Sequence, residues 1–198
     1  MRDRLRNIFR WWGANAEEVK RPMAADLEVR VPNYRTTFAV TINAPPDDVW
    51  PWLIQMGYRR GGLYSYDWLD RLFGFLDAPS ANCLLPEFQQ LKEGDVIPIG
   101  SGPGFPVRAV RPMRTLLLAG EADRVHWAWQ FELVSINKNC TRLISRNCVR
   151  YPNSFRNRFF MRLMEVAAYI MTRKMLLGIK GRAERLSVEE RFHLKHIA

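Results

Sequence analysis

Cysteine is scarce in this chain, and its spacing excludes the sites that cysteine usually builds. Only Cys83, Cys140 and Cys148 occur among 198 residues. The count is odd and no two of them have CxxC spacing, so we expect neither a disulfide framework nor a zinc site. This usage favours a reducing cytoplasm as the location of the protein.

Long hydrophobic runs and catalytic signatures are also missing. No run of about 18 uncharged apolar residues occurs, so no transmembrane helix is predicted, and residues 1–12 lack the apolar core of a signal peptide. There is no Ser-His-Asp order, no Gly-rich phosphate loop and no HExxH motif. We therefore predict no catalytic residue, no metal and no cofactor.

Basic side chains are abundant, with 30 Lys and Arg against 20 Asp and Glu and a formal net charge of +10. Such a surplus favours an anionic partner or a dispersed solvated surface. No nucleic-acid motif accompanies it, so nucleic acid is not expected. Residues 2–12 form an amphipathic pattern, with Phe9 and Trp12 opposite arginines. That pattern suits a helix on an anionic membrane, or a cap on the protein's own surface.

Period-two alternation predicts an antiparallel sheet. Tyr34–Ile42 alternates strictly, and so does Val125–Ile136, where every second residue is large and apolar. Thr141–Arg150 follows after a short polar turn, so these last two strands should form a hairpin. Alternation places Arg146 opposite Leu143 and Ser145, hence on the outside. Shorter strands are predicted over residues 96–99, 107–110 and 115–119.

Helical patterns flank and separate these strands. A helix should begin at Pro46, which suits a first helical turn, and break at Gly57. A second short helix should be capped by Ser65 or Asp67 and stop at Gly74. A long helix is predicted from Ser154 to about Leu186, and its apolar face should cover the apolar face of the sheet. Residues 13–33 look irregular apart from one helical turn at 14–20.

The stretch from Ile42 to Leu69 carries a family resemblance. Its Trp50-Pro-Trp-Leu53 and Tyr64-Ser-Tyr-Asp67 segments resemble an uncharacterised bacterial branch of the SRPBCC superfamily, which includes START, Bet v 1 and polyketide-cyclase-like proteins. The resemblance implies an α+β helix-grip fold: a curved antiparallel sheet wrapped around a long C-terminal helix, with two short helices after the first strand. It implies hydrophobic-ligand binding and, in some members, cyclisation or dehydration of polyketides.

Three segments follow from this reading. Residues 1–33 form an amphipathic helix and an irregular segment, residues 34–186 the helix-grip domain, and residues 187–198 a tail. A space between sheet and helix is a default ligand site. The residues predicted to line or border it share an inward position or a polar group at its mouth: Phe38, Val40, Tyr64, Tyr66, Asp67, Trp127, Trp129, Phe131, Leu163, Val166 and Ile170.

The function favoured by the sequence is binding, with transport left open, of a hydrophobic small molecule or lipid in that space. Peripheral contact with anionic membrane would bring the protein to such a ligand. Two alternatives stay open: a polyketide cyclase- or dehydratase-like enzyme, and an interaction module whose cavity is filled by side chains. Tyr64, Tyr66 and Asp67 are either hydrogen-bonding or acid–base groups at a cavity mouth, or parts of the fold, with Asp67 in an ion pair with Arg59 or Arg60.

Overall fold

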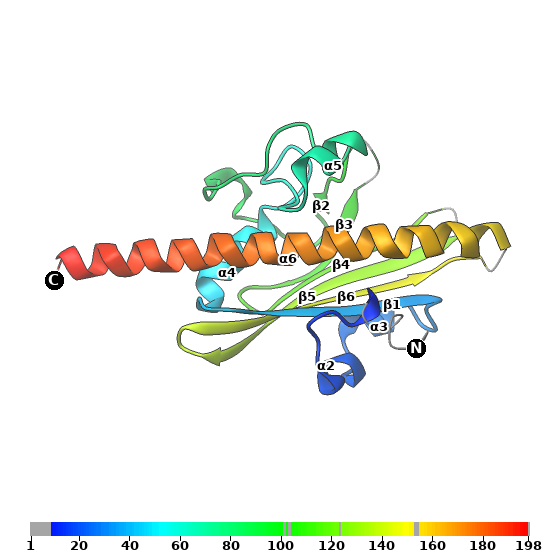
Figure 1. The fold of residues 1–198 in the computed structure, drawn as a ribbon, viewed down its shortest axis with the longest axis horizontal. Coiled ribbons are helices and arrows are strands. Elements are labelled where there is room, and N and C mark those ends of the chain that lie inside the picture. The colour runs from blue at the N-terminus through cyan, green and yellow to red at the C-terminus, as the bar shows by residue number, and fades with distance from the viewer. Residues whose placement is uncertain (1–8, 101, 103, 123, 153–154, 198) are drawn as a thin grey trace.

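A computed structural model describes residues 9–100, 102, 104–122, 124–152 and 155–197 (Figure 1). Six strands form one antiparallel sheet in the order β1-β6-β5-β4-β3-β2. Their bounds are β1 Tyr34–Ile42, β2 Val96–Ile97, β3 Phe105–Arg111, β4 Thr115–Ala122, β5 Val125–Asn137 and β6 Cys140–Arg150. Strands β5 and β6 form the predicted antiparallel hairpin, with Trp129 opposite Asn147.

A long helix, α6 (Phe155–Ile197), crosses the concave face of the sheet. Its Met175, Leu176 and Ile179 are buried against strand residues such as Phe38 and Phe131. The helix-grip prediction is thereby confirmed: the chain is an α+β protein in which a curved sheet holds one helix. Helix α6 continues past Leu186 to Ile197, so it extends into the segment predicted as a tail.

Two short helices lie between β1 and β2, as predicted. Helix α4 (Pro46–Ile54) begins with proline at its first turn and buries Trp50 and Trp52. Helix α5 (Asp67–Leu72) follows a turn through Gly61 and Gly62, and a single 3-10 turn, η1, spans Pro86–Phe88. None of the helices in the described ranges has an apolar stretch long enough to cross a membrane.

The N-terminal segment covers the convex face of the sheet, which the sequence reading left open to solvent. Helix α2 (Ala16–Lys20) is capped by Asn15, and helix α3 (Ala24–Glu28) follows it. Both lie on the side of the sheet opposite α6 (Figure 1). Ala25 and Val29 pack there against Leu117, Ala119, Ala128 and Cys148. The segment at 13–33 is therefore more ordered than predicted, and the sheet is buried on both faces.

Residues 9–12 dock on the domain itself. The ring of Phe9 lies 5.1 Å from that of Tyr169, and Trp12 meets Phe38 edge-on at 6.4 Å. Arg10 pairs with Glu165 at 2.6 Å, and the carbonyl of Trp12 accepts a hydrogen bond from the backbone of β1. This part of the predicted amphipathic helix acts as a cap, while its residues 1–8 lie outside the described residues.

Candidate functional site

A row of aromatic side chains lies along the concave face of the sheet. The ring centroids of Phe105 and Trp127 are 4.3 Å apart, and those of Trp129 and Phe131 are 4.8 Å apart. The indole N–H of Trp129 donates to Ser145 Oγ at 2.9 Å, which fixes that ring. Trp127, Trp129 and Phe131 lie on the inner face, where period two placed them.

The middle of this interior is closed by side chains. Phe38 is 2% exposed, and Phe131 and Leu143 are 0% exposed. A water-sized void beside these residues would leave part of their surface accessible, so the described side chains fill the space around them. Val40 is half-buried and packs against the same cluster. The aromatic residues of β3 and β5 on this inner face that keep some exposed surface are Phe105, Trp127 and Trp129, which are all half-buried.

The helix side of the site differs from the prediction. Val166 and Ile170 are 41% and 42% exposed, so their expected position against the sheet was wrong. Tyr169, Met175, Leu176, Ile179 and Ala183 face the core instead. The side chain of Leu163 lies outside the described residues. Residues 163–171 are apolar on almost every side, and a pattern of that kind does not define one helical face.

Tyr64 is a buried structural residue and does not lie at the entrance of a cavity. It is 1% exposed and adopts a left-handed backbone conformation with φ of 56°. Its ring meets Trp52 edge-on and carries the guanidinium of Arg182 at 4.7 Å from its centroid. Burial raises the pKa of its phenol above the ordinary value, with Gln55 and Arg182 opposing. The phenol is thus held protonated.

Tyr66 and Asp67 lie at the start of α5. Tyr66 is half-buried, and the ammonium of Lys174 lies 5.6 Å from its ring centroid. Both carboxylate oxygens of Asp67 accept hydrogen bonds from Ser80, at 3.0 Å from its backbone N–H and 2.7 Å from its hydroxyl. The expected ion pair with Arg59 or Arg60 is not formed, because Arg59 pairs with Asp77 and Arg60 donates to the carbonyls of Ile54 and Met56.

Gln55, which the sequence reading overlooked, organises the loop behind Tyr64. It is 0% exposed. Its side chain donates to the carbonyl of Cys83 and accepts from the backbone N–H of Leu85 and the amide of Gln89. The one signal in the sequence is a polar residue directly after the apolar run at residues 49–54. Such a side chain is buried only when it is fully hydrogen-bonded.

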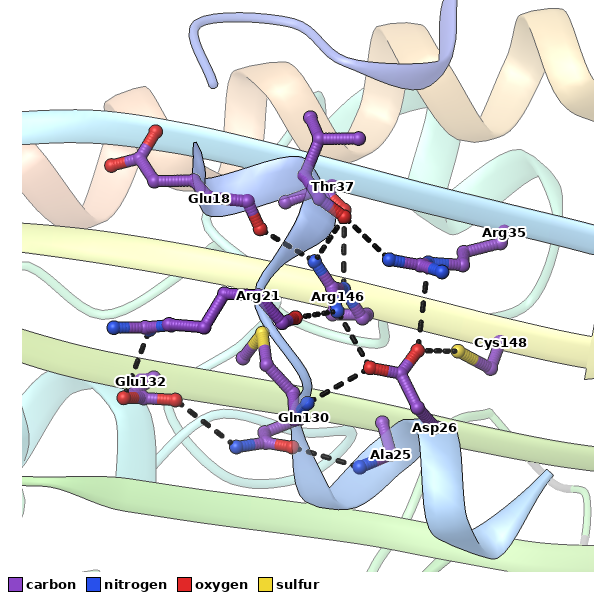
Figure 2. Close-up of polar contacts among 12 residues, drawn as sticks. Glu18, Arg21, Ala25, Asp26, Arg35, Thr37, Gln130, Glu132, Arg146 and Cys148 are labelled. Atoms are coloured by element: carbon purple, nitrogen blue, oxygen red, sulfur yellow. Dashed lines mark hydrogen bonds and ion pairs between the residues drawn. The ribbon is translucent and has the colours of Figure 1, made fainter. Parts of the chain in front are cut away.

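Arg146 was expected outside, and its burial is the main correction on the convex face (Figure 2). It is 0% exposed. Its guanidinium donates to Asp26 Oδ2 at 2.6 Å, to Thr37 Oγ1 at 3.1 Å and to the carbonyls of Glu18, Val19 and Arg21. Alternation was correct about the face, but α2 and α3 cover that face. The arginine ties the N-terminal segment to the sheet.

Around Arg146 the polar groups are paired with one another. Arg35 lies 3.5 Å from Asp26, and Gln130 accepts from the backbone N–H of Ala25. The thiol of Cys148 contacts the same carboxylate. Burial, followed by the charge of Asp26, raises the pKa of that thiol to about 12. This arrangement is a structural network, with no accessible nucleophile or base.

Two surface hollows lie outside the interior. One, of about 310 Å³, is bordered by Trp52, Cys83, Arg182 and Arg185. The other, of about 430 Å³, is bordered by Arg10, Trp11, Lys20 and Arg35 near α2. Across the described part of the chain, no group of three or more His, Cys, Asp or Glu side chains is arranged to hold a metal ion.

Comparison with known proteins finds similarity only among solved structures. No protein-family model and no curated protein matches the sequence. Among solved structures, the Zhui aromatase/cyclase from Streptomyces sp. R1128 is similar at 17% identity and a TM-score of 0.46, over 77% of this chain and 94% of that one. The Aha1 dimer from Colwellia psychrerythraea is similar at 16% identity and 0.46, over 76% and 96%. A conserved protein from Geobacillus kaustophilus is similar at 14% identity and 0.46, over 77% and 96%. At these values the likeness says nothing about ligand or activity.

Proposed function

We propose that the protein binds a hydrophobic small molecule or lipid against the inner face of the sheet, beneath α6. The observation that carries the proposal is the half-buried aromatic end of an otherwise closed apolar interior, at Phe105, Trp127 and Trp129. A ligand lying there would remove the remaining ring surface from water, at about 25 cal/mol per Å². Phe38 and Phe131 close the far end, so the ligand is small or lies partly outside.

The interaction-module alternative is favoured by a different observation, the filled middle of the interior. The enzyme alternative has no comparable support. Tyr64 is buried beneath Arg182, and both oxygens of Asp67 are engaged by Ser80. Both groups are thus already engaged by the fold.

Native mass spectrometry of the protein purified without detergent tests the proposal, together with titration by the neutral apolar dye Nile red. We expect a bound apolar mass, and about tenfold weaker dye binding for Trp127→Ala and Trp129→Ala, because each removes a large part of the apolar surface. Trp11→Ala is the matched control, since Trp11 is 41% exposed and borders the hollow near α2 instead. Absence of both ligand and dye binding, or an equal loss in the control, would favour the interaction module.

We further propose that an anionic lipid surface contacts the protein at α5. Trp68, Leu72 and Phe73 are 67%, 73% and 50% exposed, and Arg71 is exposed between them. The two acids of α5 are withdrawn from this tip, since Asp67 is bonded to Ser80 and Asp70 is 0% exposed. Trp, Leu and Phe beside Arg are the composition of an interfacial anchor. The net charge of +10 complements an anionic bilayer.

A further inference from the structure

The hollow of about 310 Å³ lies between the end of α4, the loop at residues 82–84 and the last turns of α6. Trp52, Leu84 and Leu186 give it an apolar wall, and Arg182 and Arg185 give it positive charge. It is separate from the aromatic row, because none of its lining residues belongs to the sheet. Its volume is at the lower end of the range for small-molecule sites.

Neither guanidinium group forms an ion pair with a described carboxylate, and Asp67 acts on Arg182 only through its charge. Arg182 donates to the carbonyls of Ala81 at 2.7 Å and Gly178 at 3.2 Å, and it stacks on Tyr64. These partners orient the group without neutralising it. Among the side chains that the structure describes, no carboxylate lies within 4.0 Å of Arg182 or Arg185. Burial lowers the pKa of Arg182; the charge of Arg185 adds to this, and Tyr64 and Asp67 oppose it.

The second hollow, near α2, shows the opposite situation. Arg10 there pairs with Glu165 at 2.6 Å, and Arg35 lies 3.5 Å from Asp26. Each of these two arginines therefore already has a carboxylate within ion-pair distance, although Asp26 is shared with Arg146. A half-enclosed, oriented arginine with no acid partner is the arrangement found where an anion binds.

We infer that the hollow at Arg182 and Arg185 binds a small monoanionic carboxylate with an apolar body. Two positive groups and the single acid on its wall, Glu189, leave a charge of +1, which suits one carboxylate better than a dianion. The carboxylate would pair with the guanidinium groups, and the apolar body would lie on Trp52, Leu84 and Leu186.

Isothermal titration with benzoate tests this inference, with benzamide as the neutral isostere. We expect benzoate to bind, benzamide to bind at least about tenfold more weakly, and Arg185→Gln to weaken benzoate binding about tenfold. Arg108→Gln, an exposed change of the same charge on β3, should leave it unchanged. Equal binding of benzoate and benzamide, or equal losses in both variants, would overturn the inference.

Cys83 offers a local readout, because it is exposed and borders the same hollow. Iodoacetate carries a carboxylate and iodoacetamide does not, while both alkylate a thiolate by displacing iodide. Peptide mapping should show a higher iodoacetate-to-iodoacetamide rate ratio at Cys83 than at half-buried Cys140, and Arg185→Gln should abolish the difference. Equal ratios at the two cysteines would count against the site.

Nile red binding by Arg185→Gln should remain normal. Failure of the carboxylate site is therefore distinguishable from failure of the proposed function.

Discussion

Gly178 of α6 lies directly against the backbone of Tyr64. A Cβ atom added to Gly178 would stand 2.2 Å from the carbonyl oxygen of Tyr64 and 2.9 Å from its Cβ. One helical turn later, Arg182 covers the Tyr64 ring. The glycine thus sets how closely the long helix approaches the loop that carries the Tyr64–Asp67 segment.

Replacing this glycine should separate the two backbones. We expect Gly178→Ala to lower the free energy of unfolding by about 1–3 kcal/mol, because a backbone atom cannot move aside as a flexible side chain can. Gly181→Ala is the control, since nothing lies within 4 Å of its added Cβ. It should stabilise by up to about 1 kcal/mol through helix propensity. Urea denaturation measures both, and equal shifts would contradict the close approach.

Arg146→Met should lower the free energy of unfolding by about 3 kcal/mol or more. It leaves buried carbonyls without a hydrogen-bond donor and removes the closest partner of Asp26. Arg146→Lys should not restore stability, since an ammonium cannot supply the planar set of donors. Arg150→Met, on the exposed end of the same strand, should stay within about 0.5 kcal/mol of the wild type. Urea denaturation again decides, and limited proteolysis should show early cleavage within residues 13–33 in the Arg146 variants only.

The sheet was predictable because the side chains of a strand alternate between two faces, and in these strands one of the two faces is clearly apolar. Trp127, Trp129 and Phe131 alternate with Ala128 and Gln130, so the inner face followed directly. The hairpin followed from the short polar turn at residues 137–139. The helix-grip arrangement itself came from the resemblance in the Trp50–Leu53 and Tyr64–Asp67 segments, since periodicity alone does not fix how a helix crosses a sheet.

The incorrect predictions concern features that are determined by contacts between residues far apart in the sequence. The face of α6 could not be read from residues 163–171, because Val166 and Ile170 are as apolar as the buried Met175 and Ile179. The burial of Arg146 depends on carbonyls from residues 18–21, more than a hundred positions away. An arginine on an alternating strand indicates exposure unless the segment that covers it is known.

Asp70 should make stability depend on pH. Burial raises the pKa of its carboxyl, the hydrogen bond from Ser65 opposes this, and Asp67 adds to the rise. The folded protein therefore binds the proton more tightly than the unfolded chain, and stability falls as pH rises from the ordinary value of 3.8 through the folded pKa. Asp70→Asn should gain stability relative to the wild type across that window. A difference that does not change with pH in urea titrations would contradict this account.

Cys148 should resist thiol reagents while the protein is folded. Its pKa is raised to about 12 and its side chain is buried beneath α3, whereas Cys83 is exposed. Titration with 5,5′-dithiobis(2-nitrobenzoate) at neutral pH should label Cys83 rapidly and Cys148 only after unfolding, as checked by peptide mapping. Arg146→Met should speed the labelling of Cys148, because it loosens the cover. Rapid native labelling of Cys148 in the wild type would show that α3 does not protect it.

The exposed tip of α5 gives a test of the proposed lipid contact. Serine at Trp68, Leu72 and Phe73 together should abolish co-sedimentation with vesicles that contain phosphatidylserine, because the apolar anchor is lost. Stability should stay within about 0.5 kcal/mol per site, since these side chains contribute little to the core. Serine at Leu27, Val31 and Ile136, which are 75%, 86% and 55% exposed elsewhere, is the matched control and should keep full binding.

The charge on the same tip separates a lipid surface from a protein partner. Arg71→Gln should weaken binding to anionic vesicles about fivefold and leave the weak binding to neutral phosphatidylcholine vesicles unchanged, since each basic residue near the bilayer contributes about 1 kcal/mol. Added salt should weaken the wild type in the same way. If the wild type instead forms larger species in sedimentation equilibrium without vesicles, and the Trp68, Leu72 and Phe73 variant does not, then α5 is a contact between copies of the chain. The lipid proposal is wrong in that case.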